Sequence, residues 1–396
     1  MKPERWPVLT GEDRAAVARV LDHGVLSGAG APEMRALEAE FAAAVGARFC
    51  LATNSGTSAL HVALAAAGVG PGDEVIVPAL GFIATAQAVL HAGAMPVFAD
   101  VDPATYNINV ADAARRVNPR TRAIVPVHLH GLPADMDGIA ALGRQAGLTV
   151  VEDAAQAHGA LYKGRAVGTL GAMGAFSLNS TKNLPAGEGG LFVTESEELY
   201  ARAARVRFDG LEPPSKWDAS HPLDDEADGR ASVRGWMYLP GELTAALARS
   251  QLQRLAETTA RSQRNATRLG ERLGRIPGVE PPVVPADRTH VFHKYRVRLD
   301  PARAGLSLGP VALRDRLLEA LRAEGVEAVL WQTAPLPAHP LFALRERYRS
   351  AEAALESTLL IGSQSYPLFA QPLEVVDAWA DGFERAWSAI RRSLRL

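Results

Sequence analysis

The sequence predicts an α/β protein, with a large domain built on a mostly parallel sheet flanked by helices and a smaller C-terminal α/β domain. Three observations predict this fold. The chain has 396 residues, more than one hydrophobic core usually supports. Short apolar, β-branched runs alternate with helix-patterned stretches from about residue 48 to residue 194, and strands and helices mix again after about residue 278. We therefore expect an N-terminal arm and the large domain in residues 1–245, and the small domain in residues 246–396.

The first half of the chain reads as repeated β-α-β units. The expected strands are Phe49–Thr53, Glu74–Pro78, Pro96–Asp100, Ala123–Leu129, Leu148–Glu152, Ala172–Ser177 and Gly190–Thr194. The expected helices are Ser58–Ala67, Ile83–His91, Ala111–Val117 and Met136–Ala146. Because the crossovers of such units are right-handed, the repeats imply a mostly parallel sheet with helices on both faces.

The second half begins with an irregular segment. Asp209–Arg234 is rich in aspartate and poor in apolar residues, and long irregular connections are usually functional loops or disordered ones. A long helical stretch, Glu242–Leu273, follows it. The remainder contains an expected strand at Lys294–Leu299 and expected helices at Val311–Ala323 and Val375–Arg392. This mixture predicts the smaller α/β domain.

Composition and charge exclude several classes of partner. The 42 basic and 44 acidic residues give a formal net charge of −2, so no global field favours nucleic acid or an acidic membrane. The single cysteine, Cys50, excludes an internal disulfide and fits a reducing compartment, and its apolar flanks predict a buried, inert thiol. The first residues have no apolar segment behind their charges, so we expect no signal peptide there, and no run of ~20 apolar residues occurs in the sequence. We expect a cytoplasmic protein that binds neither nucleic acid nor membrane.

The first of three ordered motifs, Asn54–Leu60, lies at an expected strand-to-helix junction. Gly56 allows a tight turn, and Thr57 and Ser58 place hydroxyls beside the free N–H groups of a helix N-terminus. Such a junction binds anions, most naturally a phosphate. The alternative is an ordinary helix with a good N-cap.

The second motif, Val150–His158, places Asp153 and Gln156 just past the carboxyl end of an apolar strand. Ligands of open α/β sheets bind at that edge. An aspartate there can keep a pyridinium nitrogen protonated, and a glutamine can hydrogen-bond a nearby oxygen. The alternative is that Asp153 only caps the next helix. His158 is more typical of a supporting residue than of an acid or base.

The third motif, Phe176–Gly190, places Lys182 in a glycine-rich turn between two expected strands. Only five lysines occur in the chain, so few candidates exist for chemistry that needs an amine. Most lysines lie on the surface, but the apolar flanks of this one predict burial. Burial lowers the pKa of an amine from about 10.4 and makes the amine a nucleophile toward an aldehyde.

Together the three motifs resemble the sugar aminotransferase family of the DegT/StrS type, which depends on pyridoxal 5'-phosphate (PLP) and serves antibiotic, lipopolysaccharide and deoxysugar pathways. Further segments match that family: Val25–Gly28, Phe41–Gly46, Pro71–Pro78, Ala84–Ala86 and Gly93–Asp100. The resemblance covers nearly the whole chain and is densest before about Thr194. It implies fold type I, the fold of aspartate aminotransferase, with PLP bound by the large domain.

The resemblance also implies roles for single residues. Lys182 would join PLP through a Schiff base, and Asp153 would pair with the pyridine nitrogen. Gln156 would contact the phenolic oxygen of the ring. Phe82 would stack on the cofactor, although without the family an ordinary core phenylalanine is the simpler reading.

The phosphate of PLP would be held by Gly56, Thr57 and Ser177. The chain departs from the family in one motif. Where relatives commonly read Gly-x-Asn-Tyr-Arg-Met, this chain has Met237 in place of the asparagine that reaches the phosphate of the partner subunit's cofactor, and Leu239 in place of the arginine. Relatives are homodimers with shared active sites, so we expect at least a dimer.

The resemblance implies transfer of an amino group from glutamate or glutamine to a keto-sugar or ketocyclitol, in secondary-metabolite or deoxysugar biosynthesis. We expect the acceptor near the Asp209–Arg234 segment, His293, Tyr295 and Trp331. One alternative is a PLP lyase or dehydratase on the same scaffold. Another is a regulator that binds PLP without turnover.

Overall fold

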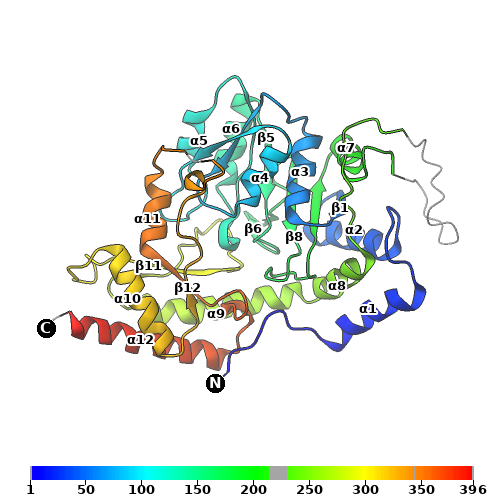
Figure 1. Cartoon of the computed structure of the whole chain (residues 1–396). Coiled ribbons are helices and arrows are strands. Elements are labelled where there is room, and N and C mark those ends of the chain that lie inside the picture. Colours follow the sequence, from blue (N-terminus) through cyan, green and yellow to red (C-terminus); the bar gives the residue numbers. More distant parts are fainter. Residues whose placement is uncertain (1, 214–229, 343, 395–396) are drawn as a thin grey trace.

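A seven-stranded sheet forms the centre of the molecule in the computed structural model, which describes residues 2–213, 230–342 and 344–394 (Figure 1). The strand order is β1-β9-β8-β5-β4-β2-β3, and only the pairings of β9 are antiparallel. The strands are β1 (Phe49–Thr53), β2 (Glu74–Pro78), β3 (Met95–Ala99), β4 (Thr121–Ile124), β5 (Thr149–Asp153), β8 (Met173–Ser177) and β9 (Gly190–Thr194). The predicted mostly parallel sheet is confirmed.

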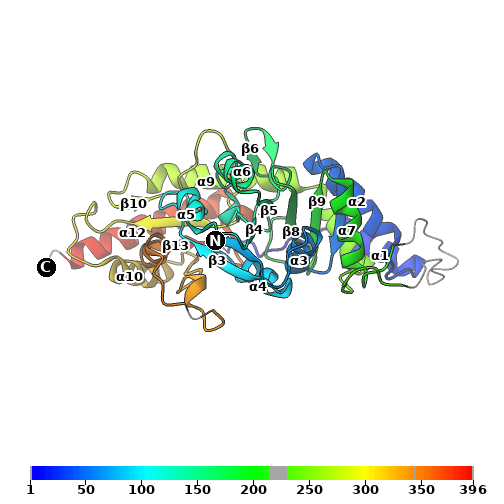
Figure 2. The same ribbon diagram turned by 90° about the horizontal axis from the view of Figure 1, so that it is seen from above.

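Helices cover both faces of this sheet, as the alternation of its side chains requires. Val75 and Val77 of β2 share a core with α3 and α4, whereas Ile76 between them packs with α6 on the other face. Figure 2 shows α3 and α4 on one side of the strands and α6 on the other. The helices of this part are α3 (Gly56–Ala66), α4 (Ala84–His91), α5 (Val110–Arg116), α6 (Met136–Ala146) and α7 (Glu197–Arg207).

An antiparallel four-stranded sheet with its own hydrophobic core forms the second part of the molecule. Its order is β10-β11-β13-β12, with β10 (Val279–Glu280), β11 (Tyr295–Leu299), β12 (Ala328–Val329) and β13 (Thr358–Ile361). The helices packed around it are α9 (Leu255–Leu273), α10 (Pro310–Ala323), α11 (Arg349–Ser357) and α12 (Leu373–Ser393). The division at residue 245 falls within α8 (Glu242–Leu252) and stays a prediction.

The N-terminal segment joins the two parts. It runs from the neighbourhood of α12 to α1 (Gly11–His23) and α2 (Pro32–Val45), which both pack on α8 (Figure 1). The backbone N–H of Trp6 donates to the carbonyl of Ser365 at 2.8 Å, and the Trp6 ring packs edge-on against Phe369. The arm is therefore anchored on the small sheet's side of the molecule.

Two expected elements differ in extent from the structure. The strand expected over Ala123–Leu129 ends at Ile124, because Pro126 has no N–H for a ladder and the chain then turns into a short 3-10 helix at Leu129–Gly131. The helix expected over Glu242–Leu273 is broken between α8 and α9. Arg254 occupies the break, and its guanidinium donates to Asp13 at 2.7 Å.

The structure covers the Asp209–Arg234 segment only in part. Of the Asp209–Arg234 segment, residues 214–229 lie outside the described residues, so the acceptor contacts expected there stay a prediction. Within the described ranges no helix is long and apolar enough to cross a membrane. Cys50 is buried in the core beneath β1, as its flanks predicted.

Candidate active site

The three motifs meet at the carboxyl edge of the parallel strands. Asp153 ends β5, Ser177 ends β8, and Lys182 lies in the turn between β8 and β9. Gly56 begins α3 directly against this edge: a Cβ atom there would lie 2.7 Å from the Cβ of Ser177. Residues more than a hundred positions apart in the sequence therefore meet at one place.

The N-terminus of α3 has the geometry of an anion site. Ser55 caps the helix, because its Oγ accepts from the N–H of Ser58 at 3.0 Å, and Ser58 Oγ donates to Asn54 Oδ1 at 2.6 Å. The N–H groups of Gly56 and Thr57 belong to the first turn and have no intrahelical acceptor. They lie at the positive end of the helix dipole, where a phosphate is stabilised.

Gly190 holds this helix start in place from the other side. A Cβ atom at Gly190 would overlap the carbonyl oxygen of Ser55 and lie 2.7 Å from the backbone nitrogen of Gly56. The strand β9 can approach the turn this closely only because residue 190 has no side chain.

We expect Gly190→Ala to displace the start of α3, to weaken binding of PLP at least about 10-fold, and to cost about 1–3 kcal/mol of stability. Fluorescence titration with PLP and thermal unfolding measure both effects. Gly70→Ala is the matched control, because a Cβ there meets no atom within 4 Å. Unchanged PLP affinity in the Gly190 variant would contradict the placement of the phosphate at this turn.

Asp153 is a buried carboxylate at the end of β5. Its side chain accepts from Thr85 Oγ1 at 2.6 Å and from the N–H of Ala155 at 3.1 Å. Burial raises the pKa of Asp153, while these hydrogen bonds and the positive charge of Lys182 oppose the rise. A protonated ring nitrogen is the kind of cation that such a carboxylate stabilises.

Lys182 presents a free amine to the same space. Among the described residues its Nζ has neither a hydrogen bond nor an ion pair, and the side chain is half-buried. Burial lowers its pKa, against the opposing charges of Asp153 and Glu188. The backbone around it is fixed, because the indole N–H of Trp6 donates to the Lys182 carbonyl at 3.1 Å. A fixed amine with a lowered pKa is suited to attack an aldehyde.

A buried network positions Asp153 from behind. The preceding residue, Glu152, accepts from the backbone N–H groups of Gly168, Leu170 and Gly171 at 2.6–2.8 Å and from His128 Nε2 at 2.9 Å. His128 Nδ1 accepts from the N–H of Ala134, so the proton is on Nε2 and points at Glu152. Both side chains are fully buried, and they fix the end of β5.

The other expected cofactor contacts surround this centre. Gln156 is buried, and its Oε1 accepts from the N–H of His130 at 2.8 Å. Phe82, just before α4, leaves 56% of its surface exposed, which is unusual for an aromatic ring in this part of the molecule. His158 packs between Phe41 and Phe176, and burial lowers its pKa to about 3, so it is neutral.

The residues expected near the acceptor separate into two groups. His293 is buried beside the lysine turn, since its Nδ1 lies 3.1 Å from Asn183 Oδ1, and Trp331 packs edge-on against His130. Tyr295 instead lies in the core of the small sheet with 2% of its surface exposed, because alternation along β11 turns it inward. The structure does not bring Tyr295 to the site.

The motif that departs from the family also has a defined position. Met237 pairs with Phe208 through a single β-bridge and leaves 53% of its surface exposed. Leu239 is half-buried against the core that contains Phe41 and Leu178. Neither side chain offers a hydrogen-bond donor for a phosphate.

Sequence reasoning missed three polar residues of the site: Thr85, Asn183 and Lys294. Thr85 and Asn183 hydrogen-bond Asp153 and His293 respectively, partners that lie 68 and 110 positions away. For Thr85 the signal was its place in the matched Ala84–Ala86 segment. For Asn183 it was the position next to Lys182. For Lys294 the only signal was that it is one of just five lysines in the chain.

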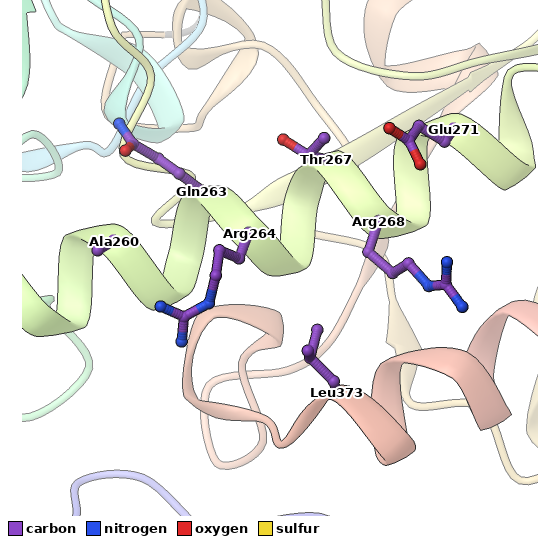
Figure 3. A pocket seen from close by; sticks show the side chains of 7 residues that line it. All are labelled: Ala260, Gln263, Arg264, Thr267, Arg268, Glu271 and Leu373. Carbon is purple, nitrogen blue, oxygen red and sulfur yellow. The ribbon is translucent and has the colours of Figure 1, made fainter.

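A hollow on the outer side of α9 is a competing candidate. Figure 3 shows Arg264, Arg268 and Leu373 facing the space between α9 and the start of α12. Arg268 is already paired with Asp377 at 2.7 Å. The residues that line the hollow include neither a lysine nor a histidine, so it offers no amine for the chemistry that the strand edge supports.

Comparison with known proteins agrees with this site. A model of the DegT/DnrJ/EryC1/StrS aminotransferase family matches residues 7–370. The UDP-N-acetyl-3-dehydro-alpha-D-glucosamine 3-aminotransferase of Acidithiobacillus ferrooxidans is 39% identical over 340 residues, covering 85% of this chain and 82% of that protein.

Solved structures are similar over the whole chain. The aminotransferase from Psychrobacter cryohalolentis superposes with a TM-score of 0.88 at 31% identity, covering 98% of this chain and 100% of that one. DesV of S. venezuelae, solved in complex with a ketimine intermediate, gives 0.82 at 33% identity and covers 96% and 99%.

The residues present fit the cofactor that this family uses, which is PLP. The start of α3 suits its phosphate, the buried Asp153 suits its ring nitrogen, and the free Nζ of Lys182 suits its aldehyde. The chain belongs to the DegT/DnrJ/EryC1/StrS aminotransferase family and is a PLP-dependent aminotransferase of fold type I.

Proposed function

We propose that the protein transfers an amino group from glutamate or glutamine to a keto-sugar or ketocyclitol, in secondary-metabolite or deoxysugar biosynthesis. The free amine of Lys182 beside the buried carboxylate of Asp153 carries the proposal of amino transfer. The choice of a sugar-like acceptor is supported by a relative that is named for a 3-keto derivative of a UDP-linked glucosamine.

In this proposal Lys182 and Asp153 are the catalytic residues. Bound PLP supplies a ring that withdraws electrons from the substrate carbon. Lys182 Nζ would hold the cofactor and, when free, would take the proton from the substrate carbon and return it. Its lowered pKa favours the neutral amine that this role needs. Asp153, oriented by Thr85, would hold the ring nitrogen in its protonated form.

We infer the remaining cofactor contacts from the positions of residues around the strand edge. Gly56, Thr57 and Ser177 would hold the phosphate at the start of α3, and Gln156 would contact the phenolic oxygen. The exposed ring of Phe82 would be covered by the cofactor.

We assign PLP binding to residues 1–245 and propose a homodimer. Exposed Met237 then offers the partner's cofactor an apolar contact in place of an amide.

The experiment that tests this proposal uses the purified protein loaded with PLP. Glutamate and glutamine are added separately, and the visible absorbance of the bound cofactor is followed. Loss of the absorbance with one donor identifies that donor. The experiment is repeated with the donor labelled with ¹⁵N. The donor-treated protein is then incubated with a 3-keto nucleotide sugar or a ketocyclitol, and transfer of ¹⁵N to this acceptor is measured by mass spectrometry.

The outcomes separate the alternatives. Labelled nitrogen in a sugar or cyclitol supports the proposal. Conversion of an acceptor without incorporation of the label indicates a lyase or dehydratase on the same scaffold. Stable PLP binding with no response to any donor or acceptor indicates a regulator, and overturns the proposed activity.

A further inference from the structure

Lys294 lies at the entrance to β11, where the small sheet meets the site. The backbone N–H of Lys294 donates to the carbonyl of His130 at 3.3 Å, and that of Val291 donates to the carbonyl of Gly131 at 3.0 Å. His130 is the residue whose own N–H binds Gln156 Oε1. The chain that carries Lys294 therefore runs along the residues that position Gln156.

A second set of hydrogen bonds ties this chain to the turn of the catalytic lysine. Asn183, the residue after Lys182, binds His293 Nδ1 through its Oδ1 at 3.1 Å and donates its Nδ2 to the carbonyl of Val291 at 3.3 Å. His293 precedes Lys294. Lys182 is therefore next to Asn183, and Lys294 is next to His293. Because Asn183 and His293 bind each other, the backbones at the two lysines are held close together.

Charge interactions place the amine of Lys294 near the lysine turn. Lys294 comes directly before β11, in which Tyr295 points into the core of the small sheet and Arg296 points to the large sheet, where it donates to the carbonyl of Ala104 and lies 4.0 Å over the ring of Tyr106. The charge of Lys294 acts on His130 and His293, and the charge of Lys182 acts on Lys294. The amine of Lys294 therefore lies on the side of the small sheet that faces Lys182.

Lys294 has no counter-charge in this position. Among the described residues its Nζ forms no hydrogen bond and no ion pair. The titratable groups that it acts on are Lys182, His130 and His293, and none of them is acidic. Burial and the charge of Lys182 lower the pKa of Lys294 to about 8, so the amine still carries its proton at pH 7. A half-buried cation without a partner is unfavourable, and an incoming anion relieves that cost.

We propose that Lys294 binds the α-carboxylate of the amino donor. This inference rests on the proposed function, since both glutamate and glutamine carry that carboxylate and a neutral keto-sugar does not. The phosphate of PLP is not its partner, because Gly56 and Ser177 form the phosphate end of the site at the start of α3, whereas Lys294 lies on the side of Gln156. The other source of an anion is a charged acceptor, such as a nucleotide diphosphate.

The test compares Lys294→Met with Lys163→Met, a surface lysine paired with Asp137, in the PLP-loaded protein. Calorimetry measures binding of glutarate, a dicarboxylate that cannot donate an amine. The absorbance response measures the concentration of glutamate or glutamine needed for half-saturation. We expect Lys294→Met to weaken both by about 10- to 100-fold and to leave the melting temperature unchanged. Lys163→Met is expected to behave as wild type.

Several results overturn the inference. Wild-type affinity for glutarate in the Lys294 variant, or no glutarate binding by the wild type, removes the carboxylate site. Weaker binding of a nucleotide-linked acceptor with unchanged glutarate affinity assigns the cation to the acceptor instead. Failure of every donor to change the absorbance contradicts the proposed function, yet the glutarate measurement still reports on Lys294.

The pH dependence gives an independent readout. Protonated Lys294 is the binding form, so glutarate affinity of the wild type is expected to fall as pH rises from 7 through about 8 to 9.5. Lys294→Met has no such group, and its residual affinity is expected to stay constant over the same range. A wild-type affinity that does not change with pH contradicts the assignment.

Discussion

Lys182→Ala is expected to abolish amino transfer, with a loss on the order of 10²- to 10⁴-fold or more. In the proposed mechanism the substitution removes both the amine that would hold the cofactor and the base that would move the proton. Among the described residues Lys294 is the other half-buried lysine near this position, and its backbone N–H is bound to the carbonyl of His130. We expect that it does not replace Lys182.

The measurement is the single-turnover rate of the absorbance change with saturating donor, together with reduction by borohydride. Reduction is expected to leave PLP covalently attached to the wild type and unattached to the variant. Lys163→Ala, on the surface, is the control. Covalent attachment of PLP in Lys182→Ala would show that another amine carries the cofactor, and the assignment of this lysine would be wrong.

Glu152→Gln is expected to lower the free energy of unfolding by about 3–5 kcal/mol, the range for removing one partner of a buried charged network. The carboxylate accepts from three backbone N–H groups and from His128, with no exposure to water. A glutamine at this position turns an N–H₂ group toward at least one of those donors, and leaves that donor unpaired. The substitution therefore affects the fold before it affects the chemistry.

Denaturant unfolding of the PLP-free protein measures this loss. Glu198→Gln is the matched control, because Glu198 pairs with Arg202 on the surface of α7 and its loss is expected to cost under about 1 kcal/mol. A change in Glu152→Gln as small as that of the control would mean that the network around β5 relaxes without cost. Weaker PLP binding is expected to accompany the destabilisation, since Asp153 is the next residue.

The sequence was most informative where a local pattern decides the structure. Strand β2 and helix α6 have the same bounds in prediction and structure, because periodicity and caps are properties of neighbouring residues. The position of Asp153 followed from the rule that ligands bind at the carboxyl ends of parallel strands, and Lys182 was singled out by its glycine-rich turn between two apolar strands. The end of β4 was missed, because Pro126 was read as part of an apolar run rather than as a residue that stops a ladder.

What the sequence did not reveal are contacts between distant segments. Thr85 binds Asp153 only because α4 and β5 meet at one edge, and Asn183 binds His293 only because the small sheet approaches the lysine turn. Tyr295 was expected near the acceptor, yet the alternation of β11 turns it into the core of the small sheet. Such facts depend on how elements pack, which periodicity alone does not determine.

The anchoring of Trp6 has a consequence for communication within the molecule. Trp6 binds the carbonyl of Lys182 through its indole N–H. It binds the 365–369 segment through its backbone N–H and its ring. Any rotation of the small sheet relative to the large one therefore pulls on the backbone that aims the reactive amine. The N-terminal residues therefore couple the orientation of Lys182 to the relative tilt of the two sheets.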